Sequence, residues 1–462
     1  MATNSVVPMA KLPMASAITA SQRTDGGGDT TDMGTDGRAR ERVTGATVVA
    51  LMPFIKPTYV FQHTKVAQLT PLGLNRVMAT VGDVFALIRD RRDITRTEIG
   101  QLTGLSRTAV AARIAALSAL GLVREREQAP STGGRPPTLL SFDVDAGIVL
   151  SAAIGISRTR LAVCDLAGEV LAITDIDQEV ALGPDDLMPD VVKRLDVMLQ
   201  DYQGVPVYGV GLSLPGTVDR ARGCSRDSPI LRGWDGVELR PYFAELPRLS
   251  NAPVVLDNDS NAIAVVEGRG HDDVLVIKAS SGLGAGIVAG GVLQRGAAQA
   301  AGEFGHTKIA AAVGLPCRCG DTGCVEAIAG GWALVHALQQ QGRSVRNLRD
   351  VVEIAHGGDA EARRMIRDSG RYVGEVLAAA VNLLNPAVVV VAGDMAGAYE
   401  IFVAGLRETL YGNATAQATR TLEVIPAAYG SQSGTVGGAV MVLDEVLGAR
   451  AVDALVAGAP RA

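Results

Sequence analysis

The chain has 462 residues, of which 47% are hydrophobic, 4% aromatic and 20% charged. This composition is typical of a globular protein with roughly two to four domains. The net charge of -6 excludes a protein that binds polyanions over its whole surface. Ten arginines and six acidic residues between Arg76 and Leu140 nevertheless give that segment a charge of +4. This segment is a candidate for local contact with nucleic acid, although chance clustering would also account for its charge.

The first 75 residues differ in composition from the rest of the chain. Residues 21–44 are rich in Gly, Asp, Thr and Arg and contain almost no large apolar residue. Such a segment cannot bury enough apolar surface to offset the entropy lost on ordering. We therefore predict that residues 1–75 are a disordered N-terminal tail.

Residues 76–142 show the pattern of three helices followed by two short strands. Apolar residues recur at helical spacing between residues 77 and 88, which predicts the first helix. Thr95 begins a capping-box pattern for the second helix, which we expect to end near Gly104. Ser106 is placed to cap a third helix. With two strands joined by a Gly-rich loop, the segment is predicted to be a winged helix-turn-helix domain.

The start of the third helix carries side chains that suit contact with DNA. A recognition helix places its N-terminal side chains in the major groove, where Arg pairs with guanine and Ser or Thr contacts bases or phosphates. Ser106, Arg107 and Thr108 are the candidates for this role. Arg113 could reach a phosphate or be a solvated charge, and Arg135 lies in the wing loop. Use of the whole module for protein contact is an alternative.

From about residue 146, strands and helices alternate. This alternation predicts an α/β domain over residues 146–450, followed by a C-terminal tail over residues 451–462. The longest apolar stretch, residues 376–391, is interrupted by Asn382 and Asn385 and is expected to be a buried helix and strand, not a membrane span. The chain shows neither a signal-peptide pattern nor an evenly spread cysteine framework, so we expect a cytoplasmic protein without a membrane partner.

One histidine and three cysteines form a pattern that suits zinc. Cys317, Cys319 and Cys324 lie within eight positions in a Gly-rich loop, and His306 precedes them. Three thiolates and an imidazole can hold Zn²⁺ in a tetrahedral site. Because four protein ligands leave no open position, this site is predicted to be structural and to stabilise the loop 306–324. Unconnected thiols beside a core histidine are the alternative.

Five short motifs between residues 209 and 326 resemble those of a known family. They are Gly-Val-Gly-Leu-Ser-Leu-Pro-Gly-Thr-Val-Asp at 209–219, Asn-Asp-Ser-Asn at 258–261, Gly-Leu-Gly-Ala-Gly at 282–286, Gly-Glu-Phe-Gly-His at 302–306 and Cys-Val-Glu at 324–326. With these motifs, the chain from about residue 81 resembles the ROK family, named for repressors, open reading frames and kinases. The Gly-Gly-Arg-Pro wing at 133–136 resembles that of the repressor branch. The resemblance implies an actin-like (ribonuclease H-like), two-lobed ATPase or sugar-kinase fold with sugar bound in the cleft.

The resemblance also implies a set of sugar-binding residues. Asn258 and Asp259 match residues that contact sugar hydroxyls, and Asp259 matches the general base of the family kinases. Glu303, His306 and Glu326 match further sugar contacts, so that His306 would bind zinc through one nitrogen and face the sugar with the other. Clustered carboxylates, amides and imidazole also suit a ligand with many hydroxyls on chemical grounds, although any single acid could instead cap a helix or form a surface pair.

The phosphate loop departs from the family pattern. Where the kinases have Asp-x-Gly-Gly-Thr, this chain has Gly155-Ile156-Ser157-Arg158-Thr159, so that the Asp and both glycines are replaced. A second loop has Ser-Ser-Gly at 280–282 in place of Gly-Thr-Gly. Because phosphoryl transfer depends on positioned phosphates and metal, we predict weak ATP binding and no kinase activity, with the acid at position 259 as a vestigial base. Arg158 could still attract an anion.

These features predict a sugar-responsive transcription regulator, in keeping with the repressors of the family. Its expected partners are a double-stranded DNA operator and a sugar or sugar-phosphate effector. A homodimer or homotetramer is expected, because paired winged helices set the spacing of DNA half-sites. One alternative is an active ATP-dependent hexose kinase with an accessory DNA-binding domain. Another is a protein-interaction module that has lost both ligands.

Overall fold

The computed structural model describes residues 79–91, 93–127, 138–178, 182–226, 228 and 230–458. The predicted N-terminal tail and the wing residue Arg135 therefore lie outside the described residues. Across the described ranges, no helix combines the length and the apolar character that a membrane span requires.

Three helices and a small antiparallel sheet form the first part of the described chain. The helices lie in the ranges that the sequence predicts, and the strands are ordered β1-β3-β2. The bounds are α1 (Val81–Arg91), β1 (Ile94–Thr95), α2 (Arg96–Thr103), α3 (Arg107–Ala119), β2 (Val123–Glu127) and β3 (Thr138–Phe142). We refer to these elements as the N-terminal module.

Caps fix the start of α2 and the turn between α2 and α3. The Thr95 side chain accepts the backbone N–H of Glu98, and both halves of the predicted capping box are present. Helix α2 ends at Gly104, whose φ of 70° is left-handed. The hydroxyl of Ser106 accepts the backbone N–H of Ala109 at 3.2 Å and so begins α3. The turn forms because these residues satisfy backbone groups that the helix ends leave free.

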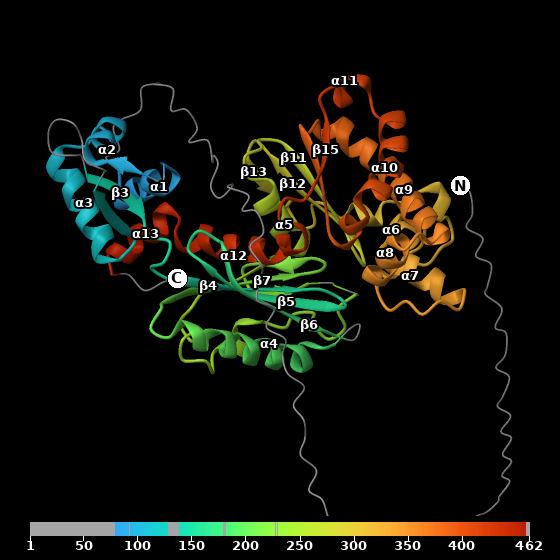
Figure 1. The fold of residues 1–462 in the computed structure, drawn as a ribbon, viewed down its shortest axis with the longest axis horizontal. Coiled ribbons are helices and arrows are strands. Elements are labelled where there is room, and N and C mark those ends of the chain that lie inside the picture. The colour runs from blue at the N-terminus through green and yellow to red at the C-terminus, as the bar shows by residue number, and fades with distance from the viewer. Residues whose placement is uncertain are drawn as a thin grey trace, which may run out of the picture. The chain divides into compact units, whose positions relative to one another are not determined.

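Two five-stranded sheets with the same topology make up two similar lobes (Figure 1). Each sheet has a three-stranded antiparallel meander continued by two parallel strands, in the orders β6-β5-β4-β7-β10 and β13-β12-β11-β14-β15. The first sheet contains β4 (Ile148–Ile154), β5 (Arg158–Asp165), β6 (Val170–Asp177), β7 (Val207–Leu214) and β10 (Val254–Asn258). The second contains β11 (Val274–Ala279), β12 (Leu283–Ala289), β13 (Val292–Gln294), β14 (Val388–Ala392) and β15 (Glu423–Pro426). A small hairpin pairs β8 (Val218–Asp219) with β9 (Cys224–Ser225).

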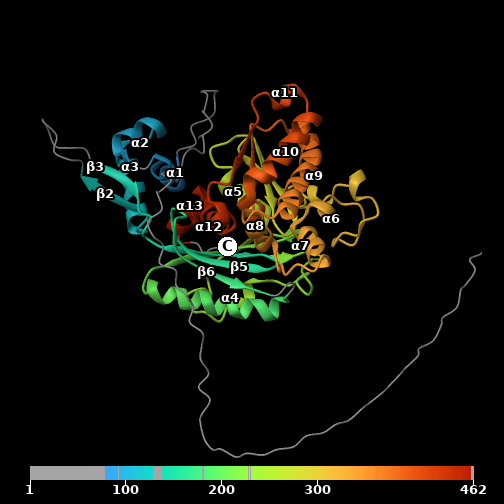
Figure 2. The ribbon, with the colours of Figure 1, turned by 45° about the vertical axis from the view of Figure 1, so that its right-hand side comes forward.

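Helices cover the outer face of each sheet, and two helices lie between the sheets. Figures 1 and 2 show α4 on one face of the first sheet, with α5 and α12 on its other face. The outer face of the second sheet carries most of the remaining helices. Their bounds are α4 (Pro184–Leu199), α5 (Asp259–Glu267), α6 (Glu326–Ala329), α7 (Gly331–Gln340), α8 (Leu348–His356), α9 (Ala360–Leu384), α10 (Tyr399–Asn413), α11 (Ala416–Thr419) and α12 (Ser433–Val446).

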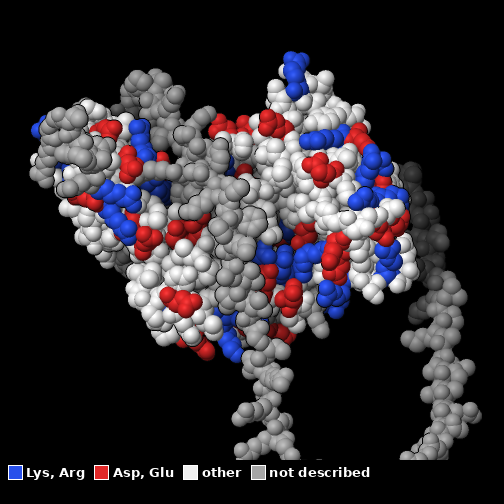
Figure 3. Space-filling model, viewed as in Figure 1, with Lys and Arg blue, Asp and Glu red and all other residues white. Residues whose placement is uncertain are grey.

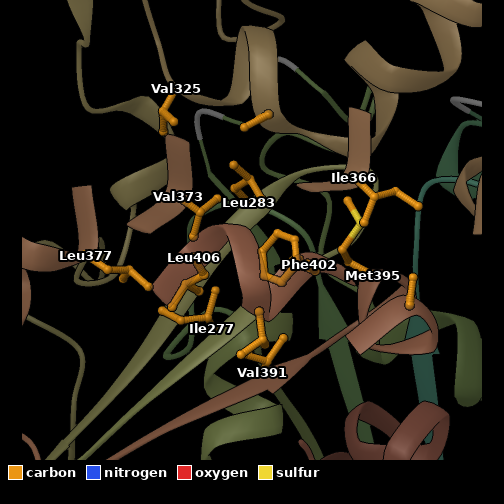
Figure 4. Packing of buried hydrophobic residues seen from close by; sticks show 14 of the residues in the cluster. Ile277, Leu283, Val325, Ile366, Val373, Leu377, Val391, Met395, Phe402 and Leu406 are labelled. Carbon is orange, nitrogen blue, oxygen red and sulfur yellow. The ribbon is translucent and has the colours of Figure 1, made fainter. Parts of the chain in front are cut away.

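Successive side chains along a strand point to opposite faces of the sheet and therefore pack against different helical layers. On β14, Val391 packs in the same cluster as Phe402 and Leu406 of α10 (Figure 4). Its neighbour Val390 packs in the opposite cluster with Ile263 of α5. Because β14 is buried on both faces, its apolar residues form an unbroken run, as expected for a central strand in a partly parallel sheet.

Glycines bring α12 into backbone contact with both of its neighbours. A Cβ atom on Gly211 of β7 would lie 2.0 Å from the carbonyl oxygen of Gly438 in α12. A Cβ atom on Gly437 would lie 1.9 Å from the carbonyl oxygen of Ala262 in α5. Any larger residue at these positions would push the helices and the strand apart.

The last helix, α13 (Ala449–Val456), packs against α1 of the N-terminal module. Its Val452 is fully buried in the cluster that contains Phe85 of α1. The carboxylate of Asp453 accepts the backbone N–H of Gly82 at 2.8 Å. The tail predicted for residues 451–462 is therefore corrected for the segment up to residue 456, because one apolar face of this segment completes the core beneath α1.

The contact between α1 and α13 can be tested at Gly82. A Cβ atom there would lie 1.9 Å from the carbonyl oxygen of Ala449. We expect Gly82→Ala to lower the free energy of unfolding by about 1–3 kcal/mol, the usual effect of overpacking a close contact. A Cβ atom on Gly412 of α10 would enter open space, so Gly412→Ala is the matched control and should be neutral or slightly stabilising. Denaturant unfolding monitored by circular dichroism measures both, and equal stabilities would show that the contact contributes little.

Candidate functional site

The cleft between the lobes is lined by the turns of two equivalent hairpins. The β4–β5 turn belongs to the first lobe and the β11–β12 turn to the second, and the first turns of α5 and α12 point into the same space. Two cavities occupy this space, one of about 250 Å³ and one of about 130 Å³. We refer to them as the larger and the smaller cavity. Both are lined by Ile156, Pro215, Asp259 and Lys278, so they adjoin each other.

The larger cavity brings together all five residues that were predicted to bind sugar. Its walls include Asn258, Asp259, Glu303, His306 and Glu326. They come from the end of β10, the start of α5, the loop after β13 and the start of α6. The cavity thus offers carboxylates, an amide and an imidazole to one ligand, which is the donor and acceptor set that a polyhydroxylated molecule requires.

Asn258 shapes the cavity by fixing the backbone around it. Its side-chain oxygen accepts the backbone N–H groups of Ser260 at 2.8 Å and Asn261 at 3.2 Å, which caps α5. Its amide nitrogen donates to the carbonyl of Gly216 at 2.9 Å. One N–H of the amide is left over for a ligand. Asn258 therefore ties the start of α5 to the turn after β7, in addition to lining the cavity.

Asp259 is paired with a lysine that the sequence motifs do not include. The Nζ atom of Lys278 lies 2.5 Å from a carboxylate oxygen of Asp259. Lys278 is near the end of β11, in the run Val-Leu-Val-Ile-Lys-Ala at 274–279. A single lysine in an otherwise buried apolar strand is a sequence signal, because burying a charge is costly unless it has a partner.

The other two carboxylates of the larger cavity differ in their surroundings. Glu326 is 2% exposed and accepts the backbone N–H of Leu283 at 2.8 Å and the indole N–H of Trp332 at 3.2 Å. Glu303 is more exposed than Glu326, but its partial burial still raises its pKa. The nearby imidazole of His306 opposes this rise, while the other acids of the cavity add to it. The cavity thus contains one rigidly held carboxylate and one whose surroundings favour protonation.

The predicted zinc ligands form one cluster beside the larger cavity. The Nδ1 atom of His306 lies 3.7 Å from the sulfur of Cys317, and the sulfurs of Cys319 and Cys324 are also 3.7 Å apart. All four ligand atoms lie within 4.8 Å of one another. Ligands bound tetrahedrally at about 2.3 Å lie roughly 3.8 Å apart, so these atoms fit a zinc ion.

The histidine connects this cluster to the cavity. Its Nδ1 atom faces the cysteines, while its Nε2 atom lies 3.8 Å from the carboxylate of Glu303. The two nitrogens of His306 thus face in the two directions that the family resemblance implies. Cys319 also lines the larger cavity. A metal held by the four ligands would fix the orientation of the imidazole towards a bound ligand.

The smaller cavity lies where the altered phosphate loops meet. Arg158 of the first loop reaches across the cleft, and its guanidinium nitrogen lies 3.3 Å from a carboxylate oxygen of Asp394. The hydroxyl of Ser280, in the second loop, donates to the other carboxylate oxygen at 2.5 Å. Arg349 of α8 crosses the same cleft and lies 3.1 Å from Asp177 of β6. Burial lowers the pKa of Arg158, and the neighbouring Arg160 lowers it further.

Of the predicted DNA-contacting residues that the structure describes, three are exposed and one is hydrogen-bonded within the N-terminal module. Ser106, Arg107 and Thr108 are all exposed at the start of α3. Arg113 instead donates to the carbonyl oxygens of Ala79 at 2.7 Å and Ala109 at 3.2 Å. This guanidinium braces α3 against the residues before α1, which differs from the phosphate contact that was considered for it. On the face in Figure 3, basic and acidic side chains are interspersed, with no division into one basic and one acidic region.

Comparisons with known proteins agree on one family. The model of the ROK family matches residues 149–445. The xylose repressor of Bacillus subtilis (strain 168) is 26% identical over 370 residues, which covers 77% of this chain and 92% of that protein. The crystal structure of a ROK family transcriptional regulator, described as a homolog of the E. coli MLC protein, matches with a TM-score of 0.67 at 25% identity and covers 83% of this chain and all of the other. A ROK family glucokinase from Streptomyces griseus, in complex with glucose and AMPPNP, gives a TM-score of 0.54 at 27% identity and covers 64% of this chain and 99% of its own.

The assignment of the four zinc ligands can be tested by replacing one of the thiols. Cys319→Ser should lower the zinc content of the purified protein and lower its Tm, because a structural metal supplies folding free energy. Cys224→Ala is the matched control, since this cysteine is buried outside the cluster and should leave the metal content unchanged. Elemental analysis and thermal unfolding measure the two effects. A full zinc complement in Cys319→Ser would refute the ligand assignment.

Proposed function

The chain belongs to the ROK family, and we propose from this premise that it is a sugar-responsive transcription repressor. The observation that carries the proposal is the extent of the match to regulators. The ROK family transcriptional regulator aligns with 83% of the chain, more than the two lobes alone make up, whereas the glucokinase aligns with 64%. The regulator match therefore extends into the N-terminal module, which a kinase does not need.

The N-terminal module is proposed to be a winged helix-turn-helix domain that reads DNA with α3. The exposed side chains of Ser106, Arg107 and Thr108 supply the base or phosphate contacts. Arg113 has a positioning role, since its guanidinium is already bonded to two backbone carbonyls. Arg135 is proposed to contact DNA from the wing. Two copies in a homodimer would match the two half-sites of a pseudo-palindromic operator.

The larger cavity is proposed to bind the sugar effector. Asp259, Glu303, His306 and Glu326 supply acceptors and donors, and Asn258 supplies one N–H as well as the shape of the turn. A structural zinc ion at His306 and the three cysteines would hold the loop that carries these groups. The sugar changes DNA binding only if it binds one arrangement of the lobes more tightly than another.

The cleft is proposed to lack kinase activity. A general base must take a proton from the attacking hydroxyl, but the carboxylate of Asp259 is held by the ammonium group of Lys278 at 2.5 Å. In the first of the loops that would position phosphates, Arg158 pairs with Asp394, which follows β14. These contacts support a ligand sensor over a phosphoryl-transfer site.

An active ATP-dependent hexose kinase is the second candidate, favoured by the fold shared with the ROK glucokinase. A coupled assay with ATP, Mg²⁺ and a panel of hexoses separates the two. We expect no turnover above background in the full-length protein, because both phosphate loops are altered. Turnover that Asp259→Asn abolishes would establish a kinase and overturn the sensor proposal.

DNA binding can be tested at the start of α3. Arg107→Ala should weaken binding to a duplex selected from random sequence by about 1–3 kcal/mol, the usual contribution of an arginine that reads a base. Arg346→Ala is the control, because Arg346 is also an exposed arginine and pairs with Asp350 on α8. Electrophoretic mobility shift at fixed salt measures both. An unchanged affinity for Arg107→Ala would place the DNA contact elsewhere.

A further inference from the structure

Arg318 is a largely buried arginine between two of the candidate zinc ligands, Cys317 and Cys319. Its side chain is 25% exposed. It is not among the described residues that line either cavity of the cleft. A charge that is removed from water needs partners, and two of the partners of Arg318 belong to the walls of the cleft.

The guanidinium of Arg318 contacts three parts of the second lobe. Its Nη2 atom lies 3.7 Å from a carboxylate oxygen of Glu326, which lines the larger cavity. The same nitrogen donates to the carbonyl oxygen of Ser281 at 3.4 Å, in the turn that lines the smaller cavity. Its Cζ atom lies 5.0 Å from the ring centroid of Trp332, which is within the range of a cation–π contact. One side chain of the metal loop thus contacts both the turn and the carboxylate.

Trp332, in the first turn of α7, contacts the same two groups. Its indole N–H donates to the same carboxylate oxygen of Glu326 at 3.2 Å, and its backbone N–H donates to the carbonyl of Ser281 at 3.0 Å. The other oxygen of Glu326 accepts the backbone N–H of Leu283 at 2.8 Å. A Cβ atom on Gly282 would lie 2.8 Å from that oxygen, so the turn packs closely against the carboxylate. Glu326 therefore cannot rotate without moving the β11–β12 turn.

We propose that Arg318 is a positioning residue that determines the specificity of the effector site through Glu326. The inference rests on the proposed function, since it concerns the sugar that the larger cavity would bind. A carboxylate has about four acceptor positions, and the donors from Leu283, Trp332 and the guanidinium use up to three of them. What remains can only accept a hydrogen bond, so this point of the site selects a ligand hydroxyl that donates one.

A fixed acceptor discriminates more sharply than a mobile one. Glu326 is 2% exposed, so a ligand without a hydroxyl at this point would leave an unpaired buried acceptor, which is costly. Without the Arg318 side chain, water would enter the vacated space and bind the carboxylate, and the missing hydroxyl would then cost less. The buried Nε atom of Arg318 has no hydrogen-bond partner among the described residues. The guanidinium thus keeps its place beside Glu326 although one of its donors is left unpaired.

The experiment measures the affinity of the full-length, zinc-loaded protein for sugars by isothermal titration calorimetry. The ligands are glucose, mannose, galactose, xylose and N-acetylglucosamine, followed by each monodeoxy derivative of the sugar that binds most tightly. In the wild-type protein, one derivative should bind at least about tenfold more weakly than its parent, because the carboxylate of Glu326 is left unpaired. Arg318→Gln should weaken the parent by about tenfold and reduce that one ratio to about threefold or less. The ratios for the other deoxy positions should stay at their wild-type values.

Two further variants separate positioning from stability. Arg318→Lys keeps a cation that can pair with Glu326, so it should restore part of the lost ratio. Arg248→Gln is the matched control, because Arg248 is a partly buried arginine of the first lobe that donates to three backbone carbonyls. It should lower the Tm without changing any ratio. Elemental analysis should find the full zinc content in all three variants, since none of them alters a residue of the metal cluster.

The fluorescence of Trp332 gives a second measurement. The chain has two tryptophans, and the other, Trp234, lies in the core of the first lobe, where its indole N–H donates to the carbonyl of Leu182 at 2.8 Å. The preferred sugar should change the emission of the wild-type protein, and the change should persist in Trp234→Phe. Arg318→Gln should reduce it, because the ring has lost its cation and its tie to the carboxylate.

The outcomes distinguish this inference from the proposed function. If Arg318→Gln weakens the parent and every deoxy derivative by one common factor, Arg318 has only a structural role, and the inference fails while the sugar-responsive repressor stands. Wild-type affinities in Arg318→Gln, equal ratios in Arg318→Lys and Arg318→Gln, or an emission that does not respond to a bound sugar would also overturn it. If no sugar of the panel binds the wild-type protein, the proposed function fails, and the inference fails with it.

Discussion

The arrangement of the cleft depends on the backbone contact of α12 with β7 and α5. Gly211, Gly437 and Gly438 allow these elements to approach until only main-chain atoms separate them. The contact places the first turn of α12 and the first turn of α5 in the same cleft, where they provide Thr435 and Asp259. The hairpin turns of the two sheets meet these helix starts because the sheets have the same topology. Both cavities are therefore a consequence of how closely two helices pack between two sheets.

Within this scaffold, the charges of the cleft are satisfied by the chain itself. Lys278 pairs with Asp259, and Arg158 pairs with Asp394 across the two lobes. Partly buried charges of this kind are stable only when each has a partner, because the cost of removing them from water exceeds what a single distant charge returns. The altered β4–β5 loop is compatible with the fold, since Arg158 faces the cleft and pairs there with Asp394 and Asp175.

Local signals were sufficient to predict most of the elements. The caps at Thr95 and Ser106, the alternation of strands and helices from residue 146 and the cluster of one histidine and three cysteines depend on neighbours in sequence or on a distinctive spacing. The long-range pairs could not be predicted, because Arg158 and Asp394 are separated by 236 positions and meet only where the two lobes face each other. The packing of α13 was not predicted for the same reason, since the partner of its apolar face is α1, which is far away in the sequence. The five residues proposed to bind sugar were predicted from family motifs and line one cavity, while Lys278, in no such motif, was overlooked.

Helix α12 links the smaller cavity, at its first turn, to the N-terminal module, beyond its last turn. Its first turn lines the smaller cavity, and the carbonyl of Leu447, just beyond its last turn, accepts a guanidinium N–H of Arg89 in α1 at 3.3 Å. With 14 residues, the helix is about 21 Å long. A lever of this length that tilts by about 5° moves its far end by about 2 Å. The N-terminal module rests on that far end and on α13, so a small rotation of α12 at the cavity would displace α3, the proposed recognition helix, without any rearrangement of the module itself.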